Sequence, residues 1–149
     1  VCLASGKKRT ICVTGDGGFM LNVQELEVVR RLDLPIQFFI FNNQGYGSIR
    51  TMQDLRFEGR HVACDANSGF TIPTLWGVAD CFGLVYQWVN SLEAETRFYG
   101  TVVSLNIDPN WQQYPRVMSS IVNGKSKPDK AEDMTPKLDP DELKRIMEE

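Results

Sequence analysis

Two apolar segments, each ending in a polar loop with glycine, constrain the fold of this chain more than any other feature. Residues 10–14 form a largely β-branched run that precedes Gly-Asp-Gly-Gly at residues 15–18. A longer apolar run, residues 35–41, precedes Asn-Asn-Gln-Gly at residues 42–45. Both runs are typical of buried strands. Residues 22–31 between them have the apolar spacing of a helix, so a β-α-β unit with parallel strands is predicted.

Both loops are expected at the carboxyl edge of one sheet, where open α/β sheets bind ligands. Three residues of the first loop lack a side chain and leave backbone N–H groups able to approach an anion: Gly15, Gly17 and Gly18. The Asp16 carboxylate, the Asn43 amide oxygen and the Gly45 carbonyl are hard oxygen ligands suited to Mg²⁺, which completes its shell with phosphate oxygens and water. The loops therefore predict a site for a metal-bridged diphosphate.

The same residues resemble the signature of the thiamine diphosphate (ThDP) enzymes, Gly-Asp-Gly followed just under thirty residues later by Asn-Asn. Here it stands at residues 15–17 and 42–43, and residues 15–26 are similar to the acetolactate synthase branch. The likeness is specific from about residue 11 to residue 47. Either loop alone is ordinary turn chemistry, but their conjunction after two apolar strands favours the ThDP interpretation. A dinucleotide site is disfavoured, because Gly-x-Gly-x-x-Gly follows neither strand.

The resemblance implies a C-terminal diphosphate-binding domain that holds ThDP and Mg²⁺. Three residues would bind the metal: Asp16, Asn43 and Gly45. Cofactor contacts are implied for eight residues: Gly15, Asp16, Gly17, Gly18, Asn43, Gly45, Tyr46 and Gly47. No catalytic acid or base is assigned to this chain, because the family's activating glutamate belongs to the pyrimidine-binding domain of a second subunit. A homodimer or homotetramer is therefore expected.

The implied reaction is decarboxylation of a 2-oxo acid such as pyruvate, with transfer of the two-carbon unit to a carbonyl acceptor. Two alternatives stay open within the family. A plain decarboxylase would release an aldehyde, and a carboligase could use a nucleotide-linked keto-sugar, since residues 45–50 also resemble ThDP enzymes of sugar pathways. A non-catalytic assembly module is disfavoured by the intact Asp16 and Asn43.

Residues 48–57 are predicted to be helical and carry Arg50, the best single candidate for an anion contact with the substrate. Residues 58–73 have no clear periodicity and include His61, the only histidine. A long irregular segment beside a predicted cofactor site is often functional. The alternative is a solvated surface, and the two interpretations stay open for each basic residue.

Further strands are predicted at residues 84–89 and 101–107, and further helices at residues 73–82 and 90–99. This alternation indicates an α/β fold, a doubly wound, mostly parallel sheet with helices on both faces. Residues 1–122 are assigned to the ThDP-binding domain, which is expected to be incomplete at its N-terminus because residues 1–6 look like the last turn of a helix. Residues 123–149 are expected to form a linker and a short helix that begins at Asp139 and Pro140.

Composition excludes some classes of protein. The 16 basic and 19 acidic residues give a net charge of −3, so there is no electrostatic case for nucleic-acid binding. No apolar run approaches the roughly 20 residues of a membrane span. The four cysteines contain no Cys-x-x-Cys pair, and reduced thiols in a cytoplasmic protein are expected.

Overall fold

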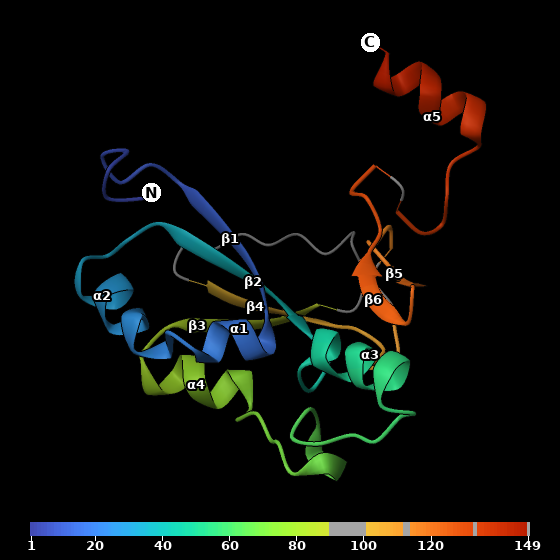
Figure 1. Ribbon diagram of the computed structural model, residues 1–149. Helices are drawn as coiled ribbons and strands as arrows, with labels where there is room; N and C mark the ends of the chain where they lie inside the picture. Colours follow the sequence, from blue (N-terminus) through green and yellow to red (C-terminus); the bar gives the residue numbers. More distant parts are fainter. Residues whose placement is uncertain (90–100, 112–113, 133, 149) are drawn as a thin grey trace. The chain divides into compact units, whose positions relative to one another are not determined.

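The computed structural model describes residues 1–89, 101–111, 114–132 and 134–148, which form two compact units, Val1–Trp111 and Gln112–Glu149 (Figure 1). In the first unit the elements are β1 (Thr10–Gly15), α1 (Asp16–Met20), η1 (Val23–Glu25), α2 (Leu26–Arg31), β2 (Ile36–Asn42), α3 (Gly47–Arg56), η2 (Ala66–Ser68), α4 (Leu75–Cys81), β3 (Val85–Val89) and β4 (Thr101–Asn106). In the second unit they are β5 (Ser119–Val122), β6 (Lys125–Pro128) and α5 (Pro140–Met147).

The first unit is built on a sheet of four strands in the order β1-β2-β4-β3, and all neighbouring strands are parallel. Val13 of β1 lies opposite Phe39 of β2, which in turn lies opposite Val103 of β4. The predicted α/β class and mostly parallel sheet are confirmed. Because the strands are parallel, the segments that follow β1, β2 and β4 leave the sheet at one edge.

The main core lies on one face of this sheet, which α1, α2 and α4 cover (Figure 1). Phe38, Ile40 and Val102 point from the strands into the helices. The Phe19 ring of α1 meets the Phe38 ring edge-on, with centroids 5.8 Å apart. Helices α2 and α4 add four buried residues: Leu26, Val29, Leu75 and Ala79. This packing fixes α1, and with it the first residues after β1.

The prediction of one continuous helix over residues 22–31 is wrong, both in where the helical structure begins and in its continuity. An α-helix already begins at Asp16, directly after β1, and the chain then passes through η1 into α2. Asn22 does not cap a helix through its side chain. Burial of Phe19 against the sheet explains why a helix forms over two glycines of low helix propensity. Residues 16–18 of the predicted glycine loop therefore belong to helix α1.

The later elements of the first unit agree with the predictions. Helix α4 and strands β3 and β4 lie within the ranges expected for them, and α3 begins and ends one residue earlier than predicted. The helix expected at residues 90–99 lies outside the described residues. Residues 1–6 form a turn rather than an assigned helix, although Ser5 N–H donates to the Val1 carbonyl over 2.9 Å, as in a helical turn.

The second unit contains a β-hairpin where the sequence predicted only a linker. Strands β5 and β6 pair in antiparallel fashion around Asn123 and Gly124, which have φ values of 53° and 72°. Asn-Gly with both residues at positive φ is the preferred two-residue hairpin turn. The boundary expected at residue 122 would cut between these strands. Helix α5 begins as predicted, with the Asp139 carboxylate accepting hydrogen bonds from two backbone N–H groups.

Across the described ranges, no helix combines the length and the apolar character that a membrane crossing requires.

Candidate functional site

The candidate site lies where three parallel strands end. Gly15 ends β1, Asn42 ends β2 and Asn106 ends β4. The Asn42 amide donates to the Asn106 side-chain oxygen over 3.2 Å, so the last two strand ends are joined. The loops predicted to carry the chemistry are therefore brought to a common edge of the sheet.

Asp16 joins the first two loops. Its carboxylate is almost fully buried and accepts a 2.7 Å hydrogen bond from the Gly17 N–H and a 3.2 Å bond from the Gly45 N–H. Burial raises the pKa of the Asp16 carboxyl above its ordinary value, and N–H groups of residues 17 and 43–45 oppose that rise. No cationic side chain pairs with Asp16 among the described residues. A buried carboxylate without a countercharge is costly, and a bound cation would remove that cost.

Three oxygen atoms converge beside this carboxylate. The Asn43 side-chain oxygen lies 2.7 Å from the Gly45 carbonyl oxygen and 3.2 Å from Asp16 Oδ1. Without a ligand, turning the amide would let its nitrogen donate to both oxygens. With a cation between them, the present orientation supplies a carboxylate, an amide oxygen and a carbonyl. That donor set fits half of the octahedral shell of Mg²⁺.

Two glycines have a packing role that the sequence did not reveal. A side chain at Gly17 would meet the Tyr46 ring, and one at Gly47 would meet the Asn43 amide. The Tyr46 ring lies instead over the bare backbone of α1 and stacks on Phe70, with centroids 4.3 Å apart. Gly17 therefore admits an aromatic ring, while its N–H is already bonded to Asp16. The Asp16 carboxylate thus occupies this N–H, and the cofactor contact implied for Gly17 stays a prediction.

The segment after α3 folds back onto the second loop. The Tyr46 N–H donates to the Cys64 carbonyl over 2.8 Å, and Gly45 forms an antiparallel bridge with Asp65. Asp65 and Ser68 form a reciprocal capping box around η2. The spacing Asp-x-x-Ser was a sequence signal for this turn, because the two side chains can each bond the other's backbone N–H. Part of the expected irregular segment is thus ordered against the site.

Arg50 is buried, and its guanidinium has partners. Nη2 lies 3.2 Å from Asp65 Oδ2, and Nη1 donates to the Pro109 carbonyl over 2.6 Å. The pKa of the Asp65 carboxyl is lowered, first by the Ser68 hydroxyl and also by the charge of Arg50. Arg50 therefore ties α3 to two other segments at the site. Its contact with a substrate anion stays a prediction.

The structure brings the predicted residues together, although unequally. Asp16, Asn43 and Gly45 converge, and Tyr46 and Gly47 pack against them. Gly15 directly precedes Asp16, and Gly18 follows it two residues later. His61 lies farther along and contacts Asp54 of α3, with Nε2 2.6 Å from Oδ1. The three residues that supply the clustered oxygens were all among the predicted site residues. Asp65, which forms an ion pair with Arg50, was not predicted as a site residue.

Comparison with known families identifies the domain. Residues 1–104 match the family described as thiamine pyrophosphate enzyme, C-terminal TPP binding domain. This match covers more than half of the chain and shows that the chain belongs to this family of ThDP enzymes.

Among curated proteins, the chain is similar to the acetolactate synthase large subunit of Haemophilus influenzae, with 29% identity over 77% of this chain and 21% of the relative. It is also similar to the acetolactate synthase isozyme 2 large subunit of Escherichia coli, with 45% identity over 53% of this chain and 14% of the relative. The chain is on the acetolactate synthase-like branch of the family. It spans about a fifth of these relatives' length or less.

A solved structure shares the fold. It is a thiamine diphosphate-dependent 4-hydroxybenzoylformate decarboxylase from Rhodococcus jostii RHA1, with a TM-score of 0.56 and 20% identity. The match covers 71% of this chain and 21% of that one. This likeness supports the predicted ThDP-enzyme fold.

Proposed function

We propose that this chain binds the diphosphate of ThDP through a Mg²⁺ ion held by Asp16, Asn43 and the Gly45 carbonyl. The observation that carries the proposal is the convergence of these three oxygens, one of them from a buried carboxylate that has no countercharge within the described part of the chain. Mg²⁺ would complete its shell with diphosphate oxygens and water. ThDP, once bound, supplies the electron sink that makes decarboxylation of a 2-oxo acid possible.

The residues of this chain would bind and orient the cofactor rather than transfer protons. Asp16 and Asn43 would fix the metal, while Tyr46 closes the space over Gly17 and holds the loop in place. Gly15, Gly18 and Gly47 complete the proposed cofactor contacts. The thiazolium-activating carboxylate would come from a pyrimidine-binding domain on a second subunit, in a homodimer or homotetramer. We further infer that the protein works in the cytoplasm.

We infer that the complete protein decarboxylates a pyruvate-like 2-oxo acid and transfers the two-carbon unit to a carbonyl acceptor. The similarity to acetolactate synthase large subunits favours this reaction. A second candidate is simple decarboxylation with release of an aldehyde, for which the fold likeness to a decarboxylase gives one observation. Incubation of the complete protein with pyruvate separates the two, since carboligation yields a product with a new carbon–carbon bond. A nucleotide-linked keto-sugar should be tested as a further acceptor.

The binding step is tested with Asp16→Ala in the complete protein. Titration calorimetry with Mg²⁺ present should show ThDP binding lost or weakened at least tenfold, because neither loop offers another carboxylate. The matched control is Asp80→Ala, which removes an exposed carboxylate from α4. Unchanged ThDP affinity in Asp16→Ala would refute the metal assignment, and an equal loss in the control would mean that the effect is not local.

A further inference from the structure

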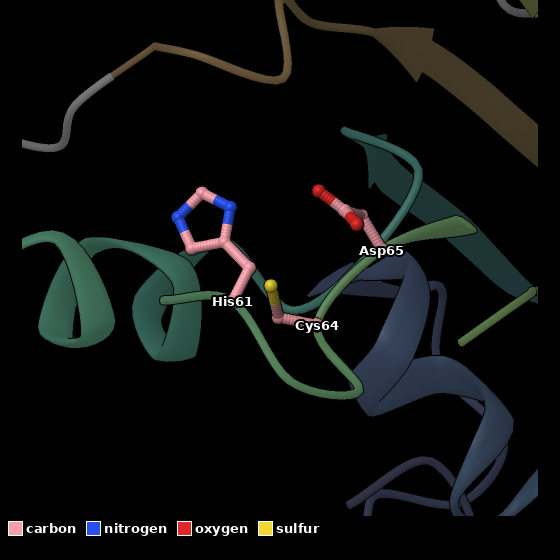
Figure 2. A group of neighbouring side chains, drawn as sticks. All are labelled: His61, Cys64 and Asp65. Atoms are coloured by element: carbon pink, nitrogen blue, oxygen red, sulfur yellow. The ribbon is translucent and has the colours of Figure 1, made fainter. Parts of the chain in front are cut away.

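A second group of metal-ligating side chains lies in the segment that follows α3. His61, Cys64 and Asp65 each place one ligand atom within 4.8 Å of the other two. Figure 2 shows the imidazole and the carboxylate on either side of the Cys64 sulfur, around one space. The set differs from the Asp16 cluster, because it contains a thiol and an imidazole instead of oxygen atoms alone.

The histidine is held in an orientation that suits a ligand. His61 Nε2 lies 2.6 Å from Asp54 Oδ1, and an Nε2–H donated to that carboxylate leaves the lone pair on Nδ1. In Figure 2 one ring nitrogen faces the side of Asp65. A carboxylate behind the distal nitrogen is the usual way in which proteins orient a metal-bound imidazole.

The cysteine is buried among polar groups. Cys64 is fully buried, yet it does not belong to the hydrophobic cluster that contains Cys2. Its sulfur lies 3.4 Å from the Ser68 hydroxyl, which also donates to the Asp65 carboxylate. A buried thiol with hydroxyl, carboxylate and imidazole neighbours is not explained by apolar packing. Such surroundings suit a metal-bound thiolate.

The local charges also balance with an ion present. Arg50 carries one positive charge beside Asp65, and Asp54 carries a negative charge beside His61. A divalent ion and a Cys64 thiolate would bring the sum over these groups to zero. The positive charge of Arg50 therefore offsets one of the three negative charges on Asp54, Cys64 and Asp65, and Arg50 pairs with Asp65 rather than with the thiol or the imidazole.

We propose that His61 Nδ1, Cys64 Sγ and the Asp65 carboxylate bind a borderline divalent ion of the Zn²⁺ class, with water as the fourth ligand. Ligand atoms around tetrahedral Zn²⁺ are about 3.3–3.8 Å apart, so side-chain shifts of about 1 Å would close the site. The thiolate and imidazole select such an ion over Mg²⁺. Because Cys64 and Asp65 bond to Tyr46 and Gly45, the site lies directly beside the proposed cofactor loop.

The test is a titration of the reduced, complete protein with Co²⁺ as a spectroscopic probe, in excess Mg²⁺ and without ThDP. We expect one equivalent of Co²⁺ to give a thiolate-to-metal charge-transfer band and tetrahedral ligand-field bands, and Zn²⁺ to abolish both. Cys64→Ser should remove the charge-transfer band, and His61→Gln should weaken binding at least tenfold. Asp54→Asn, which leaves all three ligands in place, should weaken it about 10- to 100-fold.

The control is Cys81→Ser, which removes an exposed thiol outside the cluster and should leave the spectrum unchanged. Absence of a thiolate band in the parent protein, or its survival in Cys64→Ser, would overturn the proposal. If Cys64→Ser does not fold, unchanged Co²⁺ affinity in His61→Gln overturns it equally. Failure of this test would leave the proposed ThDP and Mg²⁺ site untouched, because the assay contains no ThDP and the variants do not alter Asp16 or Asn43.

Discussion

Arg50 offers the sharpest test of how the site is held together. Arg50→Met keeps most of the side-chain length but leaves Asp65 without its 3.2 Å ion pair and Pro109 without its 2.6 Å hydrogen bond. The Arg50 side chain is 10% exposed and that of Asp65 is 18% exposed, so this pair lies between a surface and a buried salt bridge. We therefore expect a local loss of about 2–4 kcal/mol, less than or near the cost of breaking a buried pair.

Native-state hydrogen exchange is the suitable assay, because unfolding of a protein with several domains is not two-state. A loss of about 2–4 kcal/mol corresponds to roughly 30- to 1,000-fold faster exchange. Exchange of the Tyr46 amide should be among those that become faster. This amide donates to the carbonyl of Cys64, the neighbour of Asp65, which forms the ion pair with Arg50. The matched control is Arg60→Met, an exposed position where the change should stay within about 0.5 kcal/mol.

A double-mutant cycle with Asp65→Asn isolates the ion pair. We expect a coupling energy of about 0.5–3 kcal/mol, since the two side chains are in direct contact. The reasoning is refuted if Arg50→Met leaves exchange unchanged. If exchange is unchanged and KM for the 2-oxo acid rises in this variant, Arg50 contacts the substrate and does not stabilise the local structure.

Three further predictions concern other parts of the chain. Gly17→Ala should weaken ThDP binding about tenfold in calorimetry, because its methyl group displaces the Tyr46 ring, and unchanged affinity would contradict this packing role. Because the pKa of Asp16 is raised in the folded protein, the contribution of this carboxyl to the stability of the metal-free protein falls as pH rises from 3.8 through the raised pKa. The increase in Tm on adding Mg²⁺ should therefore grow over the same pH range, and an increase that does not change with pH would contradict this. Gly124→Ala, at φ 72°, should destabilise the β5–β6 hairpin by about 1 kcal/mol, measured by amide exchange over residues 119–128.

The sequence was sufficient for those features that depend on local pattern. Apolar runs predicted β1 and β2, and the helical segment between them required a parallel crossover, so the meeting of Asp16 with Asn43 followed from topology alone. The Asp139-Pro140 start of α5 was predicted because a helix cap is a short-range signal. The Asn-Gly turn at residue 123 was an equally local signal for a hairpin, but the surrounding charged composition concealed it.

Tertiary packing decided the rest. The helix at Asp16 exists because Phe19 is buried against Phe38, a contact that outweighs the low helix propensity of two glycines. Likewise, no pattern in the chain indicates that Tyr46 fills the space over Gly17, or that Asp65 pairs with Arg50. These contacts join residues far apart in sequence, and their energies arise from burial and charge pairing that exist only once the sheet has formed.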